Sequence, residues 1–145
     1  MKFSDLGLSD GLSRAVADLG YETPTPIQEK SIPTVLTGRD ILGSAQTGTG
    51  KTASFTLPMI DILASGRAKA RLPRSLILAP TRELAAQVAD SFEKFSVNNK
   101  LSMALLIGGV SFGDQNAALS KGVDVLIATP GRLLDHFERG KVLLN

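Results

Sequence analysis

The segment A-Q-T-G-T-G-K-T at residues 45–52 places the strongest constraint on the fold of this chain. A short apolar run at 40–44 precedes it, and residues 51–63 follow with the spacing of a helix. A glycine-rich loop that joins a strand to a helix and ends in Lys-Thr is typical of phosphate-binding loops, although the strict signature has Gly where this chain has Ala45. The segment therefore predicts a nucleotide-binding α/β fold. The alternative is a Gly/Thr-rich turn that ends in Lys-Thr by chance.

Each part of this loop has its own electrostatic role. Gly48 and Gly50 can adopt backbone angles that residues with a Cβ avoid, which lets successive N–H groups converge on phosphate oxygens. The following helix adds unpaired N–H groups and the positive end of its dipole. Lys51 can reach the β and γ phosphates, and the Thr52 hydroxyl can bind the Mg²⁺ ion that bridges them. We therefore expect Lys51 and Thr52 to be catalytic and Thr52 to be the metal ligand.

The rest of the chain alternates short apolar runs with longer amphipathic stretches, which predicts an α/β fold with a parallel sheet flanked by helices. At 145 residues the chain has the length of one domain. Expected strands are 40–44, 75–79, 101–107 and 123–128. Expected helices are 8–19, 26–36, 50–63, 82–95, 112–119 and 131–139, and Pro33 interrupts the second of these.

Turn-forming clusters follow three of the expected strands. They are Pro80-Thr81-Arg82, Gly108-Gly109 and Thr129-Pro130-Gly131-Arg132. Ligands of open parallel sheets bind at the carboxyl ends of the strands, so these clusters should share one edge of the sheet with the phosphate loop. Helix N-termini and exposed backbone N–H groups bind anions, and three such turns in a row favour a path for a phosphodiester backbone. Taken singly, each turn can also be read as an ordinary helix cap with a solvated arginine.

The composition is that of an ordinary globular protein, with 43% hydrophobic and 21% charged residues. A formal net charge of +2 permits nucleic acid binding without indicating it. The absence of cysteine excludes disulfides and thiolate metal sites and suits a cytoplasmic location. The N-terminus lacks a signal-peptide pattern and the apolar runs are too short for a membrane span, so we expect no membrane partner.

Five motifs, taken in order, resemble those of DEAD-box RNA helicases. They are G-Y-E-T-P-T-P-I-Q at 20–28, A-Q-T-G-T-G-K-T at 45–52, P-T-R-E-L at 80–84, G-G at 108–109 and T-P-G-R at 129–132. The resemblance extends from Phe3 to about Arg139, is to the first of that family's two RecA-like lobes, and is closest to bacterial members. It implies ATP-dependent unwinding or remodelling of RNA with Mg²⁺. An unrelated phosphate-loop kinase or transporter ATPase would not explain the segment before Gln28 or the P-T-R-E-L turn.

The resemblance also assigns roles to individual residues. Gln28 would read adenine, because a carboxamide can donate to N7 and accept from the N6 amino group, whereas guanine presents an acceptor at O6. Phe3 would lie against the base unless it is ordinary packing, and Thr25 would brace the phosphate loop unless it is a plain cap. The implied nucleotide-binding residues are Phe3, Tyr21, Thr25, Gln28, Ala45, Gln46, Thr47, Gly48, Thr49, Gly50, Lys51 and Thr52. The implied RNA-binding residues are Pro80, Thr81, Arg82, Gly108, Gly109, Thr129, Pro130, Gly131 and Arg132.

The resemblance divides the chain into an adenine-recognition segment, 1–37, and a phosphate-loop and RNA-contact core, 38–145. The sequence ends at Asn145, before the Asp-Glu-Ala-Asp motif, the Ser-Ala-Thr motif and the second lobe. We therefore expect this chain alone to bind adenine nucleotide but barely hydrolyse it, and to expose a sheet edge that permits self-association. The alternative to a helicase is an isolated, non-catalytic lobe that binds adenine nucleotide and RNA. RNA-stimulated ATP hydrolysis distinguishes the two.

Several residues outside the motifs have simpler interpretations. His136 is expected at the surface or at its boundary, without a catalytic role. The basic connector is expected to be solvated, with a supplementary RNA contact as the alternative, and four large apolar side chains are expected to pack in the core. The connector residues are Arg67, Lys69, Arg71 and Arg74, and the core residues are Met59, Met103, Phe92 and Phe95.

Overall fold

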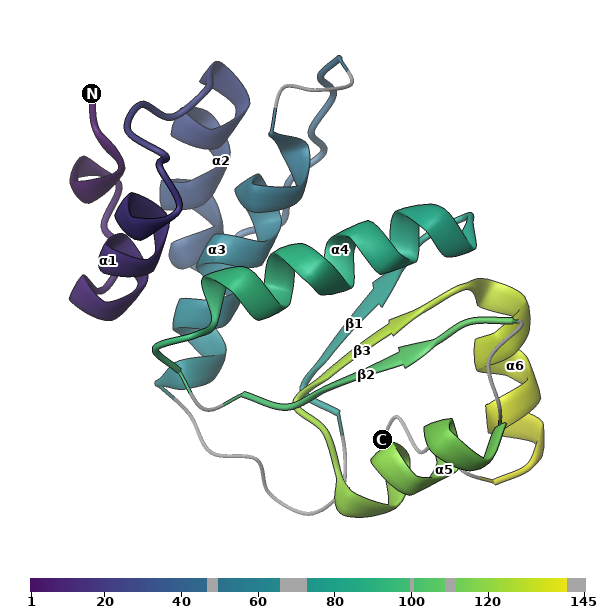
Figure 1. The fold of residues 1–145 in the computed structure, drawn as a ribbon. Coiled ribbons are helices and arrows are strands. Elements are labelled where there is room, and N and C mark those ends of the chain that lie inside the picture. Colours follow the sequence, from purple (N-terminus) through teal and green to yellow (C-terminus); the bar gives the residue numbers. More distant parts are fainter. Residues whose placement is uncertain (47–49, 66–72, 100, 109–111, 141–145) are drawn as a thin grey trace. The chain divides into compact units, whose positions relative to one another are not determined.

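The computed structural model describes residues 1–46, 50–65, 73–99, 101–108 and 112–140 (Figure 1). The chain forms two compact units. The first comprises Met1–Ser65 and Ser91–Lys100, and the second comprises Gly66–Asp90 and Leu101–Asn145. The expected Arg67, Lys69 and Arg71 lie outside the described residues.

The first unit is helical. Its elements are the 3₁₀ turn η1 (Phe3–Asp5) and the helices α1 (Asp10–Asp18), α2 (Pro26–Leu36) and α3 (Lys51–Ala64), with the last turn of α4 (Arg82–Phe95). Ser9 caps α1 by accepting the Leu12 N–H at 3.4 Å, and the Asp61 carboxylate of α3 holds Ser9 through its N–H at 2.7 Å and its hydroxyl at 2.6 Å. Apolar side chains from all three helices are fully buried: Leu12, Ile32, Leu57 and Ile60.

Two sequence predictions for this unit have different outcomes. The helix predicted for 26–36 is confirmed at both ends and continues through Pro33. The strand predicted for 40–44 is wrong: these residues form no strand, and Leu42 is fully exposed. A strand is stable only when a neighbour satisfies its backbone N–H and C=O groups, and the sheet of the described residues contains three other strands.

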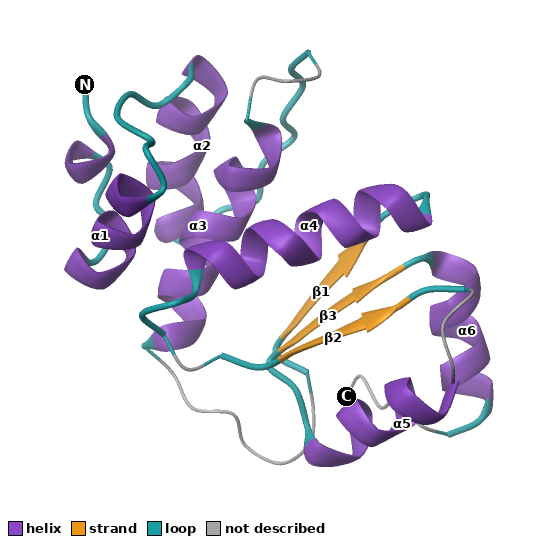
Figure 2. Ribbon diagram, viewed as in Figure 1, coloured by secondary structure: helices purple, strands orange, loops and turns teal. Residues whose placement is uncertain are grey.

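The second unit is built on a parallel sheet of β1 (Ser75–Leu78), β2 (Met103–Leu106) and β3 (Val125–Ala128), in the order β1-β3-β2. The central strand β3 is buried along its length, as expected for a parallel strand covered on both faces. Figure 2 shows α4 on one side of the sheet and α5 (Phe112–Lys121) and α6 (Pro130–Glu138) on the other. The predicted parallel sheet flanked by helices is therefore confirmed.

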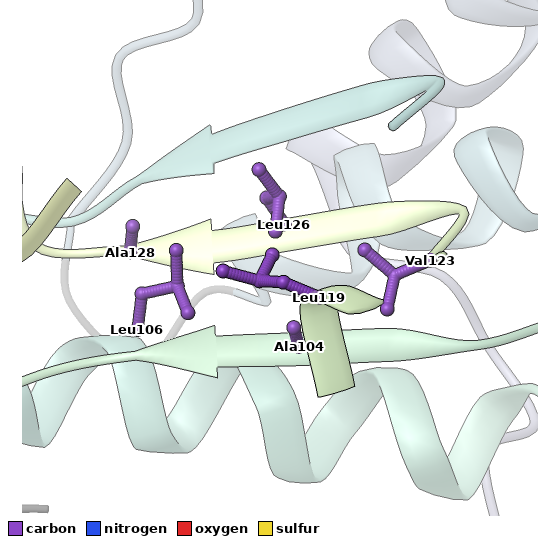
Figure 3. Close-up of a cluster of buried hydrophobic side chains, with 6 residues drawn as sticks. All are labelled: Ala104, Leu106, Leu119, Val123, Leu126 and Ala128. Atoms are coloured by element: carbon purple, nitrogen blue, oxygen red, sulfur yellow. The ribbon is translucent and has the colours of Figure 1, made fainter. Parts of the chain in front are cut away.

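An apolar cluster joins the sheet to α5 and α6 (Figure 3). Four of its residues are every second residue of β2 and β3, because side chains alternate between the faces of a strand. Ala118 and Leu133 pack against this cluster from the two helices, which fixes them on one face of the sheet. The cluster residues are Ala104, Leu106, Leu119, Val123, Leu126 and Ala128.

The packing predicted for Phe92 and Phe95 is also confirmed, because both are buried, whereas Met59 and Met103 are half-buried.

The amino ends of the three strands meet at Asp124. Its Oδ2 accepts hydrogen bonds from the Ser102 N–H at 3.0 Å and the Ser102 hydroxyl at 3.3 Å, and its Oδ1 lies 3.7 Å from Nη1 of Arg74. Arg74 is thus an ion-pair partner and not a solvated connector residue. One buried carboxylate therefore connects the segments that lead into β1, β2 and β3.

Replacement of Asp124 by Ala is expected to lower the free energy of unfolding by about 1–3 kcal/mol, because the Ser102 N–H loses a charge-assisted partner in a buried site. The Arg74 ion pair, with 3.7 Å between Nη1 and Oδ1, adds little to this value. Urea denaturation would measure the change, with the exposed Glu93→Ala as the matched control. Equal midpoints for the two variants would contradict a structural role for Asp124.

Candidate functional site

The end of the phosphate loop is the start of α3. Thr47, Gly48 and Thr49 lie outside the described residues. Gly50 is the N-cap of α3, with a left-handed φ of +80°, and the first intrahelical bond runs from the Ser54 N–H to the Gly50 carbonyl at 3.2 Å. The N–H groups of the first helical turn consequently have no acceptor within the helix. Lys51 is exposed and Thr52 is half-buried at this end, which suits a polyphosphate and a cation beside it.

Gln28 connects the first turn of α2 to the phosphate loop. Its Oε1 accepts the Thr25 N–H at 2.9 Å, and its Nε2 donates to the Gly50 carbonyl at 3.1 Å. The side chain is 2% exposed, so these two hydrogen bonds replace contacts with water. A Cβ on Gly50 would overlap Nε2 of Gln28, so glycine is required here both by φ and by space.

The predicted bracing role of Thr25 has a structural counterpart. Thr25 is the N-cap of α2, but Oγ1 makes no capping hydrogen bond. The atom is buried and has no hydrogen-bond partner among the described residues, and it lies 3.6 Å from the position of a Cβ built on Gly50. A buried hydroxyl without a partner is costly, and the bracing role of Thr25 toward the phosphate loop stays a prediction.

Phe3 and Tyr21 form a separate cluster. Phe3 is buried against the edge of Tyr21, with ring centroids 6.3 Å apart, and Tyr21 also contacts Phe95 at 5.7 Å. Both line a cavity of about 500 Å³ whose described lining also includes Lys2 and Glu22 but neither Gln28 nor Lys51. The structure therefore brings Thr25, Gln28 and Gly50 together. The base contact of Phe3 and Tyr21 stays a prediction.

The expected RNA-contact turns share one edge of the second unit. Pro80-Thr81-Arg82 follows β1, Gly108 follows β2 and Thr129-Pro130-Gly131-Arg132 follows β3, and the three strands are parallel. Gly109 lies outside the described residues. Nη1 of Arg82 donates to the Gly108 carbonyl at 3.2 Å, and Nη2 of Arg132 lies 3.9 Å from a Cβ built on Gly108. In the described part of the chain the three turns therefore share one edge of the sheet, as predicted, whereas their place beside the phosphate loop stays a prediction.

The cap interpretation of these turns holds for one residue. The Thr81 hydroxyl accepts the Leu84 N–H at 3.1 Å and so caps α4. Thr129 is the N-cap of α6, but its side chain makes no capping bond, and Pro130 occupies the first helical position. Arg82 contacts Gly108 instead of being merely solvated. The first turn therefore does more than cap a helix, because its Arg82 also contacts the second turn at Gly108.

His136 was expected at the surface or its boundary, and this prediction is wrong: its side chain is completely buried in α6. Nε2 of His136 lies 2.6 Å from Oε1 of the buried Gln115. Burial lowers the pKa of the imidazole, the positive charges of Arg132 and Arg139 lower it further, and Asp135 opposes them. Sequence reasoning missed this pair, because an amphipathic helix alone does not show how far its boundary residues are covered.

Within the described residues, no helix is long and apolar enough to cross a membrane. In the same part of the chain, no three His, Asp or Glu side chains gather as a metal site.

The sheet with its flanking helices and the phosphate-loop helix start place the chain among RecA-like nucleotide-binding domains. The sequence model of the DEAD/DEAH box helicase family matches residues 25–145, and the chain belongs to this family. The predicted family and fold class are both confirmed.

Three relatives define the similarity. The chain is 51% identical over 139 residues to the ATP-dependent rRNA helicase rrp-3 of Neurospora crassa, covering 96% of this chain and 26% of that protein. It is 47% identical over 144 residues to the ATP-dependent RNA helicase DeaD of Escherichia coli K12, covering 99% of this chain and 22% of that protein. A crystal structure of a DEAD box protein from the hyperthermophile Methanococcus jannaschii superposes with a TM-score of 0.89 at 42% identity, covering 99% of this chain and 38% of that one. The chain thus spans about a quarter of the length of these curated relatives.

Proposed function

We propose that this chain supplies the nucleotide-binding part and some of the RNA contacts of an ATP-dependent RNA helicase, which remodels RNA by hydrolysing ATP. The observation that carries the proposal is the bridge from Thr25 through Gln28 to Gly50. It connects the residue proposed to read the base with the loop proposed to hold the phosphates. A plain Gly/Thr-rich turn would not require a buried carboxamide against its last glycine.

In this proposal the first turn of α3 binds the β and γ phosphates through its free N–H groups and the Lys51 ammonium group. The half-buried Thr52 hydroxyl is the protein ligand of Mg²⁺, which would neutralise the charge of the phosphate oxygens. Gln28 reads adenine after exchanging at least one of its present partners, since both ends of its carboxamide are hydrogen-bonded within the protein. Nucleotide binding and loop geometry are therefore coupled through one side chain.

The three turns at the carboxyl edge of the sheet are proposed to bind the sugar-phosphate backbone of RNA. Helix N-termini, arginine guanidinium groups and backbone N–H groups all recognise phosphate, and contacts to phosphate carry no sequence information. The expected consequences are low sequence preference and an affinity that falls as the salt concentration rises.

The first test is a calorimetric titration of this chain with ADP and, in parallel, GDP, each with Mg²⁺. We expect ADP to bind at least about tenfold more tightly, because O6 of guanine would leave a hydrogen bond of Gln28 unmade. Lys51→Ala should weaken ADP binding about 10- to 100-fold by removing a charge-assisted contact. The exposed Lys30→Ala in α2 is the matched control and should bind ADP as the wild type does. Equal binding of ADP and GDP would contradict base recognition by Gln28.

A second candidate function is a binding lobe that holds adenine nucleotide and RNA without coupling them. The observation that favours it is that Gln28 and Gly50 belong to one compact unit of the chain and the three RNA-contact turns to the other. RNA-stimulated ATP hydrolysis by this chain separates the two candidates: stimulation supports the coupled helicase part, and its absence together with ADP binding supports the binding lobe.

A further inference from the structure

A buried polar bridge lies behind the RNA-contact edge of the second unit. It begins at His136 in the second turn of α6, passes through Gln115 of α5 and ends at the Ile107 carbonyl, directly after β2. His136 is 0% exposed and Gln115 is 4% exposed. Two buried polar side chains are costly unless they are hydrogen-bonded, and these two are paired with each other.

The hydrogen bonds of this bridge determine which ring nitrogen of His136 carries the proton. The Gln115 carboxamide nitrogen donates to the Ile107 carbonyl at 2.9 Å, so its oxygen must face His136 as an acceptor. His136 therefore carries its proton on Nε2 and donates it to Gln115 Oε1. The bridge thus has one direction, from the imidazole N–H to a backbone carbonyl.

The bridge reaches the same turn that Arg82 reaches from the other side. Gln115 holds the Ile107 carbonyl, and Arg82 holds the next carbonyl in the chain, that of Gly108. His136 itself stands four residues after Arg132, on the helix that begins with the T-P-G-R turn. Side chains of α4 and α5 therefore hold two consecutive carbonyl groups, and His136 joins α6 to them through Gln115.

We propose that His136 and Gln115 are positioning residues for RNA binding, which lock the Ile107–Gly108 backbone and the start of α6 into one arrangement. The inference rests on the proposed function, because it assigns a role toward RNA contacts that are themselves proposed. Neither side chain touches RNA in this account. Their effect is to keep the turns after β1, β2 and β3 at a fixed spacing, which reduces the ordering cost when a phosphodiester backbone binds.

The first experiment needs no RNA and no variant. Two-dimensional NMR of the ¹⁵N-histidine-labelled chain at pH 7 reports on its only histidine, and the nitrogen shifts distinguish the protonated from the bare ring nitrogen. The expected result is a neutral ring protonated on Nε2. An Nδ1–H tautomer, a charged ring or rapid exchange between tautomers would overturn the bridge whatever the RNA affinity is.

The second experiment measures binding of a fluorescein-labelled ten-nucleotide oligouridylate by anisotropy. His136→Phe and Gln115→Leu keep the approximate shape and remove the hydrogen bonds, and each should weaken RNA binding about 5- to 10-fold. Both should leave ADP affinity within about twofold, because neither residue takes part in the proposed nucleotide site. His136→Gln restores a donor toward Gln115 and should recover most of the affinity. The exposed Leu134→Ala on α6 is the matched control.

Three outcomes separate this inference from the proposed function. Loss of RNA affinity in both variants with rescue by His136→Gln supports the positioning role, and the double variant should then be no weaker than the single ones. Wild-type RNA affinity in His136→Phe would overturn the inference while leaving the proposed function intact. Absence of RNA binding by the wild type would overturn the proposed RNA site and, with it, the positioning role, even where the NMR result confirms the bridge.

Discussion

Replacement of Gly50 by Ala is expected to lower the free energy of unfolding by about 2–5 kcal/mol and to weaken ADP binding at least tenfold. About 1–2 kcal/mol comes from the left-handed backbone, which an L-residue with a Cβ disfavours. The remainder, about 1–3 kcal/mol, comes from the overlap between the new Cβ and Nε2 of the buried Gln28. ADP binding is weakened because Gly50 is the N-cap of α3, and its backbone geometry sets the direction of the first N–H groups of that helix.

Two matched glycine substitutions separate these causes. Gly38 has a similar φ of +83° with nothing within 4 Å of a built Cβ, so Gly38→Ala should show the backbone cost alone. Gly131 has neither a positive φ nor a neighbour within 4 Å, so Gly131→Ala should be nearly neutral or slightly stabilising in its helix. Urea denaturation gives the three stabilities, and calorimetry gives the three ADP affinities. A Gly50→Ala variant no less stable than Gly38→Ala would contradict the steric role of Gln28.

Most of the sheet and helix pattern follows from local sequence. The α4 prediction matches the structure at both ends, because Thr81 supplies the cap and the apolar residues of 82–95 keep helical spacing. The prediction of a strand at 40–44 was wrong. A run of apolar residues indicates that a segment is able to pair in a sheet, but it does not indicate whether a neighbouring strand is available. The motifs indicated which turns meet at one edge, since parallel strands end on the same side.

The contacts that define the candidate site were harder to predict. The Gln28–Gly50 hydrogen bond joins residues 22 apart in the chain, and His136–Gln115 joins residues 21 apart. Nothing in the local pattern specifies such pairs, because each depends on how two helices rotate as they pack. The family resemblance predicted a role for Gln28 but not its present partners, and it gave no role to His136 or Gln115. The hydrogen-bond partners of the buried carboxamides Gln28 and Gln115 are therefore what the structure shows and the sequence does not.

Replacement of Gln28 by Glu is expected to destabilise the chain by about 2–5 kcal/mol at pH 7, with the loss shrinking as the pH is lowered. The introduced carboxylate would face the Gly50 carbonyl without a proton to donate, in a site that is 2% exposed. Burial and that carbonyl raise the folded-state pKa of the new carboxyl above its ordinary value of about 4.3. The protonated group can donate to Gly50 as the amide does. Stability is therefore retained below the ordinary pKa and lost as the pH rises through the raised one.

Two control substitutions separate the effect of the charge from those of burial and of the lost hydrogen bonds. Gln87→Glu places the same carboxyl on the exposed face of α4 and should follow the wild type at both pH 7 and pH 5. Gln28→Leu lacks both hydrogen bonds, so it should lose about 1–3 kcal/mol at either pH and abolish the preference for ADP over GDP. Urea denaturation of all four proteins at the two pH values gives the comparison. If the gap between Gln28→Glu and the wild type stays constant from pH 7 to pH 5, the amide proton of Gln28 does not hold the phosphate loop. The coupling between base recognition and loop geometry would then have to arise elsewhere, with Thr25 Oγ1 the nearest candidate, because it is buried beside Gly50 without a hydrogen-bond partner among the described residues.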